Sequence, residues 1–223
     1  MKLVVVPTPI GNLGDLSPRA ADALRTADCI FCEDTRETRK LLQHIGSTQP
    51  LVAYHQHNEH QSLSAAIRRV RQSASCALVS DAGTPGISDP GYLLIRECIQ
   101  EQIPVECMPG PNALLPALVV SGLPAERFVF DGFLPHKKGR ETRIRAIAEE
   151  TRTTILYESP HRLIKTLTQL IAFCGEDRAC SVSRELSKKF EETIRGTLSE
   201  VLGHFTQHEP RGEFVLVIGG KKD

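Results

Sequence analysis

The sequence predicts an α/β protein of two domains, the first built on a parallel sheet of five strands. Between residues 3 and 121, five short apolar runs alternate with helix-like segments, a pattern typical of parallel sheets. The alternation stops at Gly122-Leu123-Pro124, which resembles a hinge. After it the strands are less apolar, and two adjacent ones lack a helix between them, which indicates a partly antiparallel sheet. We therefore expect an N-terminal α/β domain over residues 1–120 and a smaller mixed-sheet C-terminal domain over residues 121–223.

Composition sets the limits of the functional interpretation. The 223 residues carry 27 Lys+Arg and 27 Asp+Glu, so any contact with a nucleic acid must come from a local basic patch. No apolar run approaches the roughly 20 residues that span a bilayer, and the start of the chain does not resemble a signal peptide. The seven cysteines are an odd number and lie mostly in apolar runs, as reduced thiols do. We expect a cytoplasmic protein.

The elements of the first domain follow in order from these runs. The predicted strands are 3–6, 29–32, 51–54, 76–79 and 105–108. The first helix begins at Ser17, a preferred N-cap residue, with Pro18 at its first position. The second helix ends at Gly46, a common helix stop. The remaining helices are expected over about 62–72, 92–100 and 113–121.

The second domain is predicted in the same way. Its strands are expected at 128–130, 154–157, 180–183, 192–195 and 214–218, and only the last is strongly apolar. Its helices are expected at 140–150, 162–173 and 198–205.

Each strand of the first sheet is followed by a loop rich in Gly, Pro, acidic, His or Asn residues. Right-handed crossovers place all carboxyl ends of parallel strands on one edge, where open α/β sheets bind ligands. The most loaded of these loops runs from Val79 to Gly91 and contains Asp81, Gly83 and Gly86. Its glycines let a ligand approach the main chain. The alternative is an elaborate turn in which an aspartate caps the next helix.

Several kinds of chemistry lack their usual motifs. The sequence has no P-loop, no dinucleotide-binding Gly pattern and no nucleophile elbow. Cys29 and Cys32 lie three apart in a predicted strand, so they face opposite sides of it. A zinc site would need two further ligands, for which only His55 and His57 are conceivable. We expect buried thiols and no metal.

Ordered motifs lie at residues 7–13, 14–20, 33–36, 57–59, 80–85, 89–91, 109–111, 132–135, 157–162, 184–186 and 212–213. They resemble the motifs of the tetrapyrrole methylases, which are two-domain α/β enzymes that depend on S-adenosylmethionine. The similarity is greatest to the branch that methylates small-subunit ribosomal RNA, and it covers essentially the whole chain. The chain departs from the family pattern at two positions, where Ser187 replaces the expected threonine and Arg211 the expected lysine, and both keep the polar or basic character.

The resemblance implies that S-adenosylmethionine binds in a folded conformation in a cleft between the two domains. The acceptor would be the ribose 2′-hydroxyl of a cytidine in the decoding region of 16S ribosomal RNA, within the small ribosomal subunit, and the enzyme would be a homodimer. By analogy, the donor pocket would include Pro9, Gly11, Asp81, Gly83, Thr84, Pro111, Asn112, Ala113, Tyr157, Glu158, Gly212 and Glu213.

A ribose hydroxyl is a poor nucleophile, so a base or a charge that stabilises the alkoxide would help the transfer. The candidates are Glu33, Asp34, Glu59, Glu185 and Lys188. Glu33 and Asp34 follow a predicted strand and are best placed, although they also fit a capped helix start. Arg36 beside them has the forked geometry that suits a phosphate.

A local basic segment spans residues 136–145, with five Lys/Arg against one acidic residue. Lys137, Lys138, Arg140 and Arg143 are the expected RNA contacts, and Lys188-Lys189 forms a second cluster. A solvated helix face would have the same composition. Without tryptophan and with only 5% aromatic residues, the sequence shows no evident stacking platform for single strands.

Two other functions fit parts of this pattern. A tetrapyrrole-type methyltransferase acting on a small molecule would share the donor but would not need the basic segment. A non-catalytic RNA-binding module would need the basic segment but not five loaded strand ends. Activity on a porphyrin precursor would favour the first, and failure to bind S-adenosylmethionine would favour the second.

Overall fold

The computed structural model describes residues 1–55 and 59–222, so His57 and Asn58 of one motif lie outside the described residues. The chain divides into two compact units, Met1–Asn112 and Ala113–Asp223, each described here by itself. In the described part of the chain, no helix is long and apolar enough to cross a membrane.

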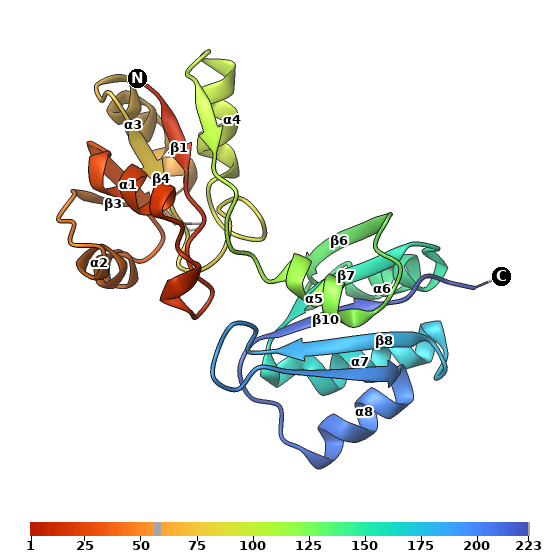
Figure 1. Cartoon of the computed structure of the whole chain (residues 1–223). Helices are drawn as coiled ribbons and strands as arrows, with labels where there is room; N and C mark the ends of the chain where they lie inside the picture. Colours follow the sequence, from red (N-terminus) through yellow and green to blue (C-terminus); the bar gives the residue numbers. More distant parts are fainter. Residues whose placement is uncertain (56–58, 223) are drawn as a thin grey trace. The chain divides into compact units, whose positions relative to one another are not determined.

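Unit 1 contains a parallel sheet of five strands, as the sequence predicts (Figure 1). The strand order is β3-β2-β4-β1-β5, and every observed pairing is parallel. Its strands are β1 (Leu3–Val5), β2 (Cys29–Cys32), β3 (Leu51–Ala53), β4 (Cys76–Leu78) and β5 (Val105–Cys107). Its helices are η1 (Leu13–Asp15), α1 (Pro18–Thr26), α2 (Thr35–His44), α3 (Glu59–Arg71) and α4 (Tyr92–Gln100).

Helices cover both faces of this sheet. On one face α1 and α2 pack their buried side chains against Val4, Ile30 and Ala77. On the other, α3 and α4 pack against Leu3, Phe31 and Leu78. Because both faces are buried, the central strands are continuous apolar runs rather than alternating ones.

The helix starts of unit 1 follow their local sequence. The Ser17 hydroxyl accepts from the Ala20 N–H at the start of α1, as its N-cap position predicts. The start of α4 is different, because the N-cap is Gly91 and has no capping side chain of its own. The carboxylate of Glu59, the first residue of α3, accepts there from the N–H groups of Gly91 and Leu93, both at 3.1 Å. The Tyr54 hydroxyl donates to the same oxygen at 3.4 Å.

Unit 2 contains a mixed sheet of five strands in the order β6-β7-β10-β8-β9. Only β6 and β7 pair in parallel, which confirms the predicted mixed sheet. Its strands are β6 (Phe128–Phe133), β7 (Thr153–Glu158), β8 (Ala179–Arg184), β9 (Glu192–Thr197) and β10 (Phe214–Ile218). Its helices are α5 (Leu114–Ser121), α6 (Arg140–Glu149), α7 (Pro160–Cys174) and α8 (Leu198–Gln207).

One face of the second sheet carries the main core, where α6, α7 and α8 bury Leu156, Leu216 and their neighbours. Helix α5 contacts β8, β9 and β10 and therefore belongs to this unit. For that reason the first unit ends at Asn112, ahead of the domain boundary expected after residue 120 and of the hinge expected at residues 122–124.

Replacing Glu59 by alanine should lower the free energy of unfolding by about 1–3 kcal/mol, because two main-chain N–H groups at the start of α4 lose their acceptor. Glu59→Gln keeps one amide oxygen and should lose less. Chemical denaturation would measure both. Glu106→Ala, which removes an exposed ion pair with Lys2, is the matched control, and an equal loss in it would contradict the capping role.

Candidate functional site

The loops that follow β1 and β4 are tied together at the carboxyl edge of the first sheet. Thr8 and Gly83 form an antiparallel bridge in which each N–H donates to the other's carbonyl at 2.9 Å. The Thr8 hydroxyl also donates to the Ser80 carbonyl at 3.0 Å. Gly83 has φ 81°, a backbone conformation that residues with a side chain rarely adopt.

The loop after β5 joins the same group. The Thr84 hydroxyl donates to the Pro111 carbonyl at 3.1 Å. Gly110 lies so close to Pro7 that an added Cβ would stand 2.6 Å from the proline Cβ. Pro9, Gly11 and Asn112, expected to touch the donor, lie in these same connected loops. The predicted convergence of strand-end loops therefore holds for β1, β4 and β5.

Carboxylates gather at this edge. Burial and the nearby Asp81 charge raise the pKa of Glu33. Burial likewise raises the pKa of Asp81, although its carboxylate accepts the Asp34 N–H at 2.9 Å. Asp89 is the most perturbed of the group, since burial and the Glu33 charge raise its pKa to about 7. Asp89 therefore exchanges its proton near neutral pH, and the raised pKa of Glu33 makes it a stronger base than an ordinary glutamate.

Asp34 has a different role from its neighbour. Its carboxylate accepts the Arg36 N–H at 2.8 Å as the N-cap of α2, and it pairs with the Arg36 guanidinium at 2.6 Å. These hydrogen bonds lower the pKa of Asp34 to about 2. The helix-cap alternative therefore describes Asp34, and such a weak base is poorly suited to accept a proton. Glu59, another candidate, caps α4.

A second group of predicted residues lies in unit 2, where the loop after β8 meets the residues before β10. The Lys188 ammonium contacts the Glu185 carboxylate at 3.0 Å and that of Glu213 at 2.8 Å. Glu185 also accepts the Glu213 N–H at 3.0 Å. Gly212 is required beside them, because its φ is 91° and a Cβ would stand 2.5 Å from Glu185 Cγ.

The charges of this group are fixed by their pairing. Partial burial of Lys188 works against its charge, but the hydrogen bonds to Glu213 and Glu185 prevail and raise its pKa. Burial of Glu185 is likewise outweighed by its hydrogen bonds to Lys188 and the Glu213 N–H, so its pKa is lowered. Lys188 is therefore a held cation rather than a base, and it suits stabilisation of an oxyanion.

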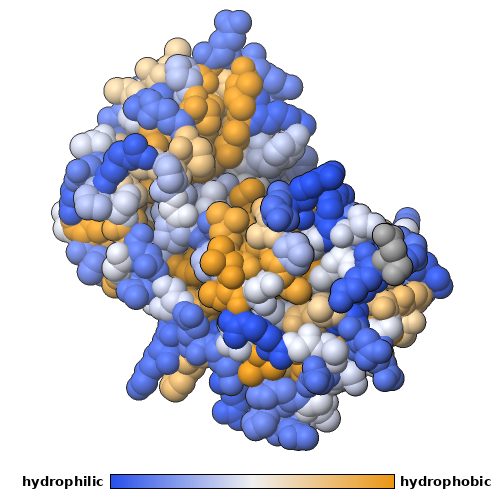
Figure 2. All heavy atoms as spheres, turned by 45° about the vertical axis from the view of Figure 1, so that its right-hand side comes forward, coloured by the Kyte–Doolittle hydropathy of each residue, from blue (hydrophilic) through white to orange (hydrophobic). Residues whose placement is uncertain are grey.

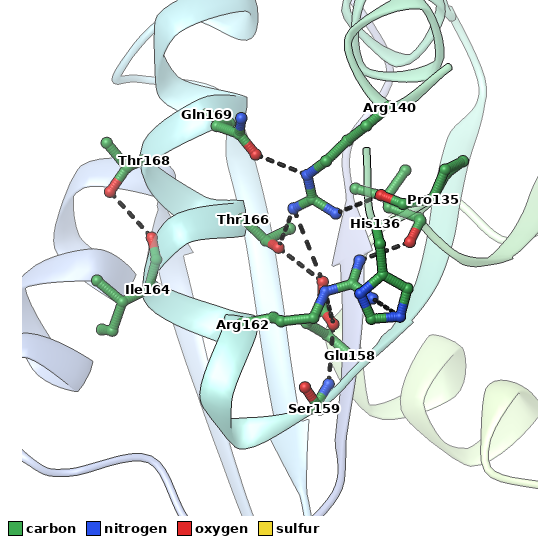
Figure 3. Close-up of polar contacts among 11 residues, drawn as sticks. Pro135, His136, Arg140, Glu158, Ser159, Arg162, Ile164, Thr166, Thr168 and Gln169 are labelled. Atoms are coloured by element: carbon green, nitrogen blue, oxygen red, sulfur yellow. Dashed lines mark hydrogen bonds and ion pairs between the residues drawn. The ribbon is translucent and has the colours of Figure 1, made fainter. Parts of the chain in front are cut away.

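Glu158 lies at the centre of a buried polar network (Figure 3). Its carboxylate accepts from the Thr166 hydroxyl at 2.6 Å and the Ser159 N–H at 2.9 Å, and it pairs with Arg162 at 3.2 Å. Only 2% of Glu158 is exposed. Its carboxylate is thus occupied within unit 2, whereas its neighbour Tyr157 is partly exposed between the rings of Phe130 and Phe133.

Arg140 belongs to this network and not to the exposed basic segment, which corrects the expected RNA contact. Its guanidinium donates to Thr166 at 2.6 Å, Gln169 at 2.8 Å and the Pro135 carbonyl at 3.2 Å, and it is 5% exposed (Figure 3). Lys137 and Lys138 in the preceding loop are exposed. The side chain of Arg143 is 55% exposed and lies 3.3 Å from Asp131.

The thiols do not form a metal site in the described part of the chain, where no group of three or more suitable ligands occurs. Cys29 and Cys32 pack into the cores on opposite faces of the sheet, as their spacing predicts. Cys29 instead contacts Cys76 on the adjacent strand, with the sulfurs 3.3 Å apart.

Asp89 is absent from the candidates that the sequence provides. Its loop contains several Gly, Pro and Asp residues, and Asp81 is the one nearest the end of the predicted strand, so the sequence favours Asp81 as the ligand-binding residue. Position alone does not reveal Asp89, because its burial and its hydrogen bond to Ser80 depend on the return of the loop toward β4. The same applies to the network partners of Arg140, which come from α7, 26 and 29 residues away.

Comparison with known proteins supports the motif-based resemblance. Residues 2–202 match the family described as Tetrapyrrole (Corrin/Porphyrin) Methylases. A Synechocystis protein named Ribosomal RNA small subunit methyltransferase I is 50% identical over 98% of this chain and 78% of its own. A Thermotoga maritima protein of the same name is 41% identical, with 99% of each chain covered.

Solved structures agree on the fold. Uroporphyrin-III C-methyl transferase from Thermus thermophilus, complexed with S-adenyl homocysteine, aligns with a TM-score of 0.69 at 18% identity, covering 98% of this chain and 97% of that one.

Asp89→Asn should stabilise the protein at alkaline but not at acid pH. The folded-state pKa of Asp89 is raised from 3.8 to about 7, so the folded protein holds this proton more tightly than the unfolded chain does. Ionisation therefore costs stability progressively as pH rises through this window. The variant should exceed the parent by about 1–3 kcal/mol at about pH 8, after allowing for solvent screening, and match it near pH 4.

Urea denaturation at several pH values measures this difference. Asp22→Asn, at an exposed aspartate of α1, controls for the loss of one charge. A difference for Asp89→Asn that does not vary with pH would contradict the raised pKa.

Proposed function

The chain belongs to the tetrapyrrole methylase family, and we propose that it transfers a methyl group from S-adenosylmethionine to the 2′-oxygen of a cytidine ribose in the decoding region of 16S ribosomal RNA. The observation that carries this proposal is the 41% identity, over 99% of both chains, with the Thermotoga maritima protein named for small-subunit ribosomal RNA methylation. The solved neighbours at 18% identity support only the fold.

The residues at the carboxyl edge of unit 1 fit the donor. When bound, S-adenosylmethionine supplies a methyl group attached to a positively charged sulfur. The carboxylates of Asp81, Asp89 and Glu33 favour such a cation at this edge. Gly11 is exposed and has no side chain, so a ligand can approach its main chain closely, whereas the main-chain groups of Gly83 are occupied by Thr8. From unit 2, Tyr157 and Gly212-Glu213 remain proposed contacts, whereas Glu158 acts through its buried network.

Glu33 is the proposed base of unit 1. Asp34 is held by Arg36 with a pKa of about 2, and Glu59 is occupied by the start of α4. Glu33 has a raised pKa and no ion pair with a Lys or Arg among the described residues, so it can receive the proton of the 2′-hydroxyl as the oxygen attacks the methyl carbon. Lys188, charged and held by two carboxylates, is proposed to stabilise the developing oxyanion.

The RNA is proposed to contact Lys137, Lys138 and Arg143 beside α6, with Arg36 as a further phosphate contact, since the Arg36 side chain is 85% exposed. A substrate in the small ribosomal subunit would place the enzyme in the cytoplasm. The family resemblance favours a homodimer, and sedimentation of the purified protein would test this.

Methyl transfer from labelled S-adenosylmethionine to small ribosomal subunits tests the reaction. The labelled nucleotide should survive alkaline hydrolysis joined to its 3′ neighbour, because a methylated 2′-oxygen cannot attack the adjacent phosphate. Label on a base, with the neighbouring linkage still cleaved by alkali, would disprove ribose methylation. Label on a porphyrin precursor and none on RNA would favour the small-molecule alternative.

Glu33→Gln should slow the transfer by about 10²–10⁴-fold, while Glu37→Gln, on the exposed surface of α2, should not.

Lys137→Ala combined with Lys138→Ala should weaken RNA binding and flatten its dependence on salt. Each lost phosphate contact reduces the log–log slope by roughly 0.7–0.9. A titration of labelled ribosomal RNA at several salt concentrations measures the slope, and Lys165→Ala, at an exposed lysine of α7, is the control. An unaltered slope in the double variant would show that this loop is only solvated surface.

A further inference from the structure

The loop of residues 185–191 joins β8 to β9 (Figure 1). Its backbone is strained and is held by hydrogen bonds within the loop. Glu185 and Ser187 have φ values of 51° and 67°, which non-glycine residues rarely adopt. Such strain persists only where surrounding contacts enforce it, and it concentrates at functional sites.

Hydrogen bonds along the loop supply that enforcement. The Lys188 N–H donates to the Glu185 carbonyl at 2.9 Å, and the Glu191 N–H donates to the Lys188 carbonyl at 3.2 Å. The Glu191 carboxylate accepts the Ser187 N–H at 2.6 Å. The tip of the loop is therefore held in one shape before any partner binds.

This braced tip projects an aromatic ring into solvent. The Phe190 side chain is 66% exposed, and its neighbours in the loop are charged. It therefore differs from the contiguous hydrophobic patches that appear on the face of the protein drawn in Figure 2. The Lys189 ammonium lies 5.6 Å from the centre of its ring. Lys189 is itself exposed and has no carboxylate partner among the residues that the structure describes.

The composition of the tip favours RNA over an apolar protein surface. Large contiguous apolar patches mark protein-binding sites, whereas the neighbours of Phe190 in the chain are Lys189 and Glu191, and Leu186 is buried. An exposed ring beside an exposed ammonium suits a nucleotide, because the ring can stack on the base and the ammonium can pair with the phosphate.

We propose that Phe190 stacks on an unpaired base of the substrate RNA while Lys189 contacts its phosphate backbone. This inference rests on the proposed function and adds a stacking contact that the low aromatic content does not predict. Lys188 lies in the same loop, so a base held by Phe190 would bring its strand to the group proposed to stabilise the oxyanion. RNA-binding proteins commonly splay unpaired bases onto aromatic side chains in this way.

Phe190→Ala should weaken binding of protein-free small-subunit ribosomal RNA by about 5–150-fold, which corresponds to the loss of one base–aromatic stack. The salt dependence of the remaining binding should not change, because no charge is removed. Lys189→Ala should give the opposite pattern, with a log–log slope reduced by roughly 0.7–0.9.

Phe190→Trp should retain binding, and Phe190→Leu, which keeps apolar area without a π-face, should not. Phe128→Ala, at an exposed phenylalanine that begins β6, is the matched control.

Three results would overturn the inference: parent-like RNA binding by Phe190→Ala, full binding by Phe190→Leu, or an effect seen with assembled subunits but absent with protein-free RNA. The last two would indicate an apolar contact with protein. Methyl transfer by the parent protein is measured in the same preparations. If the parent modifies ribosomal RNA and Phe190→Ala binds as tightly, only the stacking inference fails; if the parent modifies no RNA, the proposed function fails.

Discussion

Parallel pairing of the strands is the constraint on which unit 1 depends. In a parallel sheet every strand ends on the same edge, so the chain segments after β1, β2, β4 and β5 must converge whatever their sequence. Burial of both faces under helices excludes water from the strands but not from that edge. At this edge, polar groups can therefore be partly desolvated and still reach a ligand.

The gathering of carboxylates there has an electrostatic cost that the local structure limits. Asp34 is neutralised by Arg36, and Asp81 accepts a main-chain N–H. Only for Asp34 does the pairing prevail; burial still raises the pKa values of Glu33, Asp81 and Asp89, despite the hydrogen bonds that Asp81 and Asp89 accept. Unit 2 differs, because the pairing of Lys188 with Glu185 and Glu213 raises the pKa of Lys188 and lowers that of Glu185, which favours the charged form of each. One unit thus holds groups ready to exchange protons, and the other holds a permanent charge.

The sequence predicts the strands and most helices well because their signals are local. A β-branched run such as 3–6 has few alternatives, and Ser17-Pro18 specifies a helix start within two residues. The site is harder, because a charged side chain has the same local signal whether it faces a phosphate or a buried partner. Arg140 lies in a basic segment, yet Thr166 and Gln169 on another helix capture it. Glu59 is a glutamate near a strand end, as a catalytic residue could be, yet it caps a helix that begins 33 residues later.

The bridge between Thr8 and Gly83 has a consequence for how this sheet edge can change over evolution. Both of its hydrogen bonds use main-chain atoms, so the join does not depend on the side chains of the segments that leave it. Mutations in residues 9–12 and 85–90 can therefore alter what the edge recognises without releasing the two loops from each other. A scaffold joined in this way can keep the two loops in place while the ligand that they recognise changes, one substitution at a time.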